Sequence, residues 1–163
     1  MHKLLLMLLI LLSLISCRED VQLEPEEVVK AFLEAFENRD ASIMASYVSE
    51  GEISGLEQFV EEVKSSSNPN RLLAVADIEL SANEIRNLNA KTLYILSYEA
   101  SWERMERTGI GDMEIKYTIN SSRISGDSAF VEVTRRIIDT EETNTWVLLL
   151  ENGRWRLDSH KSL

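Results

Sequence analysis

The chain begins with an unbroken apolar run over residues 4–12, which lies between a short cationic start and a charged stretch at residues 18–20. A run of this length is typical of a secretory signal peptide, because a membrane-spanning helix needs about 20 apolar residues. The next regular pattern begins at Pro25. We therefore expect a signal peptide over residues 1–16, a polar tether over 17–24 and a single domain over 25–163.

From Pro25 onward, apolar positions recur at helical spacing. Proline suits a first helical turn, and the glutamates after it favour the positive end of a helix. The first predicted helix ends at residues 38–40, a second begins with Asp40 or Ser42 as its cap, and a third covers residues 56–63. The three predicted apolar stripes are Val28, Val29, Phe32, Leu33 and Phe36; Ile43, Met44, Tyr47 and Val48; and Leu56, Phe59, Val60 and Val63.

The middle of the chain has a less regular pattern. Residues 72–80 fit a strand or a helix, and both interpretations stay open. Ser81 and Glu84 have the spacing of a capping box, which predicts a helix that runs to about Met105. Asn89 is a point at which this segment could divide into two helices. The inward positions are expected to be Leu93, Leu96, Ala100 and Trp102.

After residues 108–112 the period of the pattern changes to two, as in half-buried strands. Alternation predicts one strand over residues 113–120 and another over 129–133. The Ser125-Gly126-Asp127 sequence between them predicts a turn. The polar residues 139–144 predict a connection to the next strand.

The last part of the chain predicts a hairpin. Residues 146–150 are continuously apolar, which predicts a central strand covered on both faces. Asn152-Gly153 is a tight-hairpin signal, and Trp155 and Leu157 are expected to point inward from the strand after it. Helices followed by antiparallel strands predict an α+β domain, with the N-terminal helices packed on one face of a curved C-terminal sheet.

Two stretches of the sequence resemble a known family. "PEEVVKAFLEAFENRD" resembles the first helix of nuclear transport factor 2-like domains, also called cystatin-like or SnoaL-like, and "GDSAFVEVTRR" with "TWVLLLENGRWRLDS" resembles their last three strands. The resemblance covers residues 25–64 and 113–158, while residues 65–112 look more helical than the family layout. It implies a cone in which a bent sheet wraps a long helix and leaves a cavity. Some members of this family are enzymes, and many only bind or dimerise.

A second resemblance concerns Cys17, the single cysteine of the chain. Leu14-Ile15-Ser16-Cys17 is similar to the lipobox of bacterial lipoproteins. This similarity implies that the Cys17 thiol receives a diacylglycerol and that the chain is cut before it. Each buried methylene of a lipid anchor contributes about 0.8 kcal/mol, so two or three acyl chains would make attachment durable.

The lipobox implies a location in the cell envelope, with the domain outside the cytoplasm. Arg18 stands where enteric-type bacteria use an aspartate for inner-membrane retention, which favours the outer membrane if the source has one. The net charge of −11 would become −12 once Lys3 leaves with the signal peptide. This acidic balance disfavours nucleic acid as a partner.

The sequence holds few candidates for catalysis. His160 lies near the C-terminus and is interpreted as a tail residue, while Tyr98, Tyr117 and Asp112 fit a cavity Tyr/Asp pair by residue type only. A core position is the favoured interpretation of Tyr117. No pattern of a serine nucleophile, a zinc or calcium site or a phosphate-binding loop is found in the sequence. We therefore expect no cofactor and no metal.

Two further groups could form binding surfaces. Arg135 or Arg136, with Arg154 and Arg156, could form a small basic patch, although cross-strand pairing with Glu132 or Asp158 is the favoured interpretation. Three tryptophans could line a pocket for an apolar ligand, although core packing is the more common position of such residues. They are Trp102, Trp146 and Trp155.

These observations favour a lipid-anchored envelope protein whose domain binds a small ligand or a partner protein without catalysing a reaction. A second hypothesis is a cavity enzyme of the isomerase or dehydratase type. A third is a structural homodimer that uses the exposed sheet face, for which Phe130 and residues 146–150 are the motivation.

Overall fold

The computed structural model describes residues 22–109 and 115–158. Within these ranges, helices come first and a four-stranded antiparallel sheet follows, which confirms the predicted α+β class. The predicted signal peptide and Cys17 lie outside the described residues, as do Asp112 and His160. No helix of the described part is long and apolar enough to cross a membrane.

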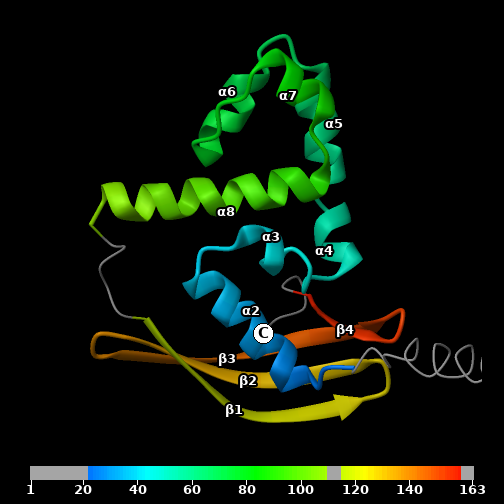
Figure 1. Ribbon diagram of the computed structural model, residues 1–163, viewed down its shortest axis with the longest axis vertical. Coiled ribbons are helices and arrows are strands. Elements are labelled where there is room, and N and C mark those ends of the chain that lie inside the picture. Colours follow the sequence, from blue (N-terminus) through cyan, green and yellow to red (C-terminus); the bar gives the residue numbers. More distant parts are fainter. Residues whose placement is uncertain (1–21, 110–114, 159–163) are drawn as a thin grey trace, which may run out of the picture.

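The first helix, α2 (Pro25–Glu37), has the predicted bounds. Its N-terminus is fixed by the Glu27 carboxylate, which accepts a hydrogen bond from the Glu24 N–H at 2.9 Å. The apolar stripe of α2 contacts β1, β2 and β4, so this helix lies across one face of the sheet (Figure 1). Asp40 caps α3 (Ala41–Met44), because its side chain accepts a hydrogen bond from the Ile43 N–H at 2.9 Å. Of the two predicted caps, Asp40 and Ser42, the helix therefore uses Asp40.

The predicted third helix is α5 (Glu57–Ser65). A short helix that the sequence pattern did not predict, α4 (Glu50–Ser54), comes before it. Residues 72–80 are neither a strand nor one helix. They include the end of α6 (Pro69–Leu73), the 3₁₀ turn η1 (Ala74–Ala76) and a segment without regular secondary structure. The Asn70 side chain holds this segment by two hydrogen bonds to the backbone of Leu80, at 3.0 and 3.1 Å.

The capping box of Ser81 and Glu84 starts α7 (Ala82–Asn87), as predicted. Asn89 divides the segment, because its side chain accepts from the Thr92 N–H at 2.8 Å and so caps the long helix α8 (Ala90–Arg107).

The strands are β1 (Ile115–Ser125), β2 (Ser128–Ile137), β3 (Thr140–Glu151) and β4 (Arg154–Leu157), in that spatial order. Asn152 and Gly153 both have positive φ, of 52° and 75°, which confirms the tight hairpin before β4. Val147 and Leu148 are adjacent in β3 and both buried, so both faces of the sheet are covered there, as predicted.

Several predicted strand limits differ from the structure: β1 runs on to Ser125, β2 runs on to Ile137, and β3 begins earlier than predicted. Residues 139–144 were expected as a connection, but β3 already begins at Thr140 and only Ile138 and Asp139 form the turn. The polar residues are part of a strand because their neighbours in β2 are also polar. Glu142, for example, lies opposite Arg135 and accepts a hydrogen bond from it at 2.6 Å.

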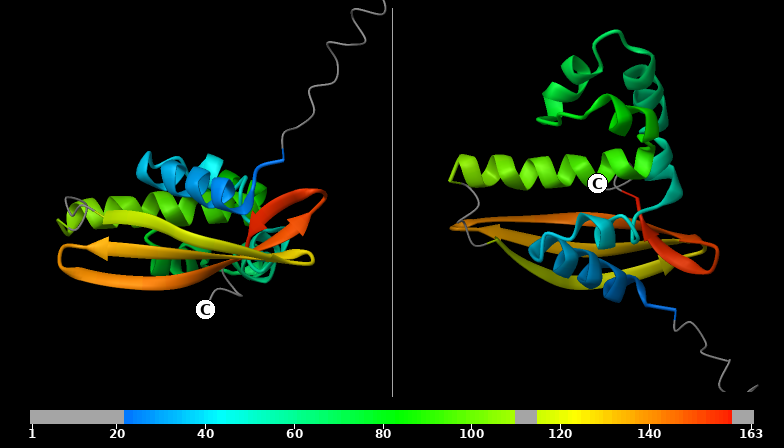
Figure 2. Two further views of the ribbon diagram at one scale, coloured as in Figure 1. Left: turned by 90° about the horizontal axis from the view of Figure 1, so that it is seen from below. Right: turned by 45° about the horizontal axis from the view of Figure 1, so that its top comes forward.

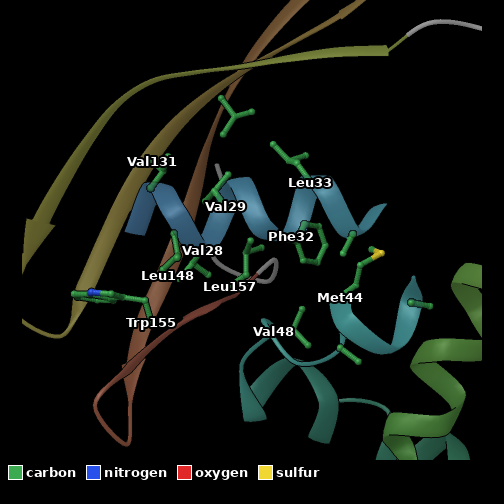
Figure 3. Close-up of a cluster of buried hydrophobic side chains, with 14 of the residues drawn as sticks. Val28, Val29, Phe32, Leu33, Met44, Val48, Val131, Leu148, Trp155 and Leu157 are labelled. Atoms are coloured by element: carbon green, nitrogen blue, oxygen red, sulfur yellow. The ribbon is translucent and has the colours of Figure 1, made fainter. Parts of the chain in front are cut away.

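Two hydrophobic cores meet at α8. The sheet core lies between α2, α3, one side of α8 and the sheet (Figure 3). The helical core lies on the other side of α8, among α5, α6 and α7. Figures 1 and 2 show these helices standing beyond α8, away from the sheet. The expectation that the N-terminal helices pack on the sheet therefore holds for α2. α3 packs on α2 and α8, and α5–α7 bury their apolar side chains against one another and α8.

Side chains fill the space between α2 and the sheet. Val29, Met44, Val131 and Leu148 are fully buried there (Figure 3). The hollows described below therefore lie on the surface, at the margin of the sheet.

Candidate functional site

The tyrosines considered for catalysis lie in a row of packed aromatic rings. Tyr98 packs between Tyr94 and Trp102, and Tyr117 packs edge-on against Phe36. Neighbouring ring centroids along the row are 5.0 to 6.5 Å apart. Burial raises the pKa of Tyr117 and that of Tyr94 above the ordinary value for tyrosine. This packing confirms the core interpretation of Tyr117.

The three tryptophans are also used in packing. Trp102 and Trp155 are buried in the sheet core. Trp146 is partly buried, and its ring lies edge-on to Phe32 with centroids 5.9 Å apart. Core packing, the favoured interpretation of these residues, is therefore confirmed.

The arginines lie at two separate places. Arg135 pairs with Glu142 near the start of β3, whereas Arg154 lies opposite Glu151 at its end. These positions are nine residues apart along β3, which corresponds to about 30 Å, so the arginines form no common patch. Arg135 does pair across strands, as favoured, but its partner is Glu142 rather than Glu132. Glu132 instead accepts a hydrogen bond from Ser121.

Two adjoining hollows, of about 500 and 830 Å³, lie along β4, and together we call them the β4 groove. Both are lined by Ser46, Asn152, Arg154 and Arg156. The smaller hollow also includes Gln22, Leu23, Val28, Tyr47, Gly153 and Trp155. The start of α2 and the β3–β4 hairpin, which border it, lie at the same end of the sheet in Figure 2.

The backbone of residues 47–49 positions one wall of the groove. Val48 forms a parallel bridge with Leu157, whose N–H donates to the Tyr47 carbonyl at 2.8 Å. The Ser49 N–H donates to the Leu157 carbonyl at 2.7 Å, and the Ser49 hydroxyl caps α4. The wall is therefore fixed to the last strand of the sheet.

The two hollows differ in charge. The charged side chains that line the smaller one are Arg154 and Arg156. The larger hollow adds Lys91 and three glutamates, one of which, Glu151, accepts a hydrogen bond from the backbone at the start of α4. The smaller hollow is thus a cationic surface on a chain whose net charge is −11. Guanidinium groups in such a place suit carboxylate or phosphate ligands.

The described residues form no candidate metal site. Among the described residues, no three His, Cys, Asp or Glu side chains come together in a way that could hold a metal ion.

Sequence analysis identified part of the groove and missed the rest. The sequence predicted the β3–β4 hairpin and named Arg154 and Arg156 as members of a possible basic patch. Cross-strand ion pairing was the favoured interpretation of these arginines. The wall formed by residues 46–49 gave no signal, because it meets β4 through a contact between Val48 and Leu157, more than 100 positions apart. Only the folded chain brings these two segments together.

Comparison with known proteins gives little further information. No protein-family model matches the chain, and no curated protein matches it. It is similar to a crystal structure from Campylobacter jejuni that is described as a candidate NTF2-like transpeptidase. The identity is 18% and the TM-score 0.41, over 83% of this chain and 97% of that one. Similarity at this level assigns no activity to the chain.

Proposed function

We propose that this is a lipid-anchored protein of the bacterial cell envelope, attached through Cys17, and that its NTF2-like domain is a binding module rather than an enzyme. The β4 groove is its binding site. The observation that carries the proposal is the smaller hollow, where two arginines and a polar turn border an open surface. An outer-membrane location, favoured by Arg18, is part of the same proposal.

The chemistry of the smaller hollow supports binding over catalysis. Its lining offers hydrogen-bond donors from arginine, asparagine and serine side chains, while the carboxylates of the groove, those of Glu50, Glu57 and Glu151, line the larger hollow beside it. The aromatic residues that a cavity enzyme could use are packed against one another in the sheet core. This arrangement can hold an anionic or polar partner without changing it.

The position of the groove suits a membrane-attached protein. Gln22 and Leu23 line the smaller hollow, and only five positions separate Gln22 from Cys17. That length of chain spans at most about 18 Å. A lipid on Cys17 would therefore keep the groove close to the membrane surface, within reach of other envelope components.

The test uses the full chain in a bacterial host. Cys17→Ser should release the protein from membranes or leave it as an unprocessed precursor. A photo-crosslinking residue at Ser46, in the groove, should give discrete crosslinked products in the parent chain. The matched control carries the same group at Val75, which is 85% exposed and lies on η1, outside the lining of the groove.

Two results would contradict the proposal. If the Cys17→Ser protein fractionates and migrates like the parent, the lipid anchor is wrong. If positions 46 and 75 give the same crosslinking pattern, the groove is not the binding site.

A further inference from the structure

The outer edge of β4 is only partly paired. At Leu157 both backbone groups bond to residues 47–49, which close that part of the edge. Residues 46 and 47 then turn away into the end of α3, because their N–H groups bond to the carbonyls of Ile43 and Met44. The closing segment therefore stops before it reaches Trp155.

Trp155 presents its backbone to the same outer edge. Strand residues two positions apart point their N–H and C=O groups to the same side. The backbone groups of Trp155 therefore point to the same edge as those of Leu157. Its cross-strand neighbour Leu150 donates its N–H to the Asp127 carbonyl at 2.9 Å, away from β4. Among the described residues, no hydrogen-bond partner is found for the Trp155 N–H or C=O. An unpaired edge of this kind can accept another strand.

The open edge lies inside the smaller hollow. Trp155 lines that hollow together with the arginines on either side of it in β4. The hollow has about 500 Å³ of space and shares four lining residues with the larger one, so a short extended segment can lie alongside the strand. Side chains alternate along a strand, so an added segment would present every second side chain toward the arginines.

From these observations we infer that the β4 groove binds an extended peptide segment of a protein partner, which adds to the edge of β4 at Trp155 and places carboxylate side chains on Arg154 and Arg156. The backbone edge provides the attachment, and the two arginines provide the selection for acidic residues. This inference rests on the proposed function, because it names the partner class of the same site.

The contact is short, and its strength is limited accordingly. Residues 153–155 are the available edge, since the edge at Leu157 is already paired. A three-residue contact is much smaller than a standard protein interface, so we expect a Kd above about 10 μM for an isolated peptide. Attachment of both partners to one membrane would raise the effective concentration.

The experiment measures binding of a synthetic probe to the full chain in detergent. The probe is a capped five-residue peptide that alternates valine and glutamate. We expect it to bind and to slow hydrogen exchange of the Trp155 amide. A probe with lysine in place of glutamate, and one N-methylated at its central residues, should each bind at least tenfold more weakly. Arg156→Gln should weaken binding of the original probe about tenfold, whereas Arg71→Gln, at an exposed position of α6 outside the groove, should leave its binding unchanged.

Each alternative result would overturn the inference. If N-methylation has no effect while Arg156→Gln does, the hollow binds anions without strand addition. If vesicles with anionic phospholipid, and not the peptide, protect the Trp155 amide, the occupant is a lipid head group. If no probe binds while anchoring depends on Cys17 and Ser46 still crosslinks, the peptide inference fails and the proposed function stands.

Discussion

Ile138 has an unfavourable backbone conformation. Its φ is 55°, in the left-handed region that β-branched residues rarely adopt. It is the first residue of the two-residue turn between β2 and β3, a position that often requires positive φ. Its side chain is 67% exposed, so burial offsets little of the backbone cost.

Replacing Ile138 by asparagine should therefore stabilise the protein. Asparagine tolerates positive φ, and we expect the free energy of unfolding to rise by about 1 kcal/mol. The measurement is urea denaturation of the parent and the Ile138→Asn variant. Ile124→Asn is the control, because Ile124 is also exposed but lies in strand β1. A gain of equal size in both variants would mean that the backbone of Ile138 is not the cause.

At the scale of elements, α8 connects the two cores. Tyr94 and Trp102 belong to the sheet core, while Leu93 and Ala100 belong to the helical core. Asp77 ties the preceding turn η1 to the end of this helix. Its carboxylate accepts hydrogen bonds from Arg104 at 2.7 Å and Arg107 at 3.0 Å.

The stability supplied by Asp77 should depend on pH. The hydrogen bond from Arg104 holds the pKa of Asp77 below its ordinary value of 3.8. A lowered pKa in the folded state stabilises the protein fully above the unfolded-state pKa, and this contribution is lost as the pH falls through the folded-state pKa. Asp77→Asn should thus lower the urea midpoint at pH 7, and the difference should shrink below about pH 4. Asparagine keeps the positive φ of 58° at this position. A difference that is equal at pH 7 and pH 2.5 would contradict the charge interaction.

The sequence predicted elements that are defined locally. The helix of residues 25–37 has its stripe and its starting signals in one segment, and Ser81, Glu84 and Asn89 cap helices through neighbours three residues away. The strand start at Thr140 was missed because polar residues in a strand depend on a partner strand. The division into two cores was missed because α8 is apolar on two sides, so it has no single stripe.

At the scale of the whole molecule, the shared helix should make the two cores cooperative. Met44 in the sheet core and Leu73 in the helical core are both fully buried. Met44→Ala and Leu73→Ala should each cost about 2–5 kcal/mol. In either variant we expect one unfolding transition, the same by tryptophan fluorescence as by far-ultraviolet circular dichroism.

The tryptophans make this comparison sensitive, because all three belong to or pack against the sheet core. If Leu73→Ala loses helical signal before the fluorescence changes, the helical core unfolds alone. The coupling through α8 would then be weaker than the packing indicates.

The two cores are completed at different points along the chain. The helical core joins residues 60–100 and is complete once α8 has been made. The sheet core joins α2 to β4, more than 100 positions later, so it is complete only once the last strand has been made. The same strand supplies Trp155 and both arginines of the β4 groove. Under the proposed function, a chain that lacks its last strand would have no groove, so an occupied groove would report that the whole domain has been made and folded.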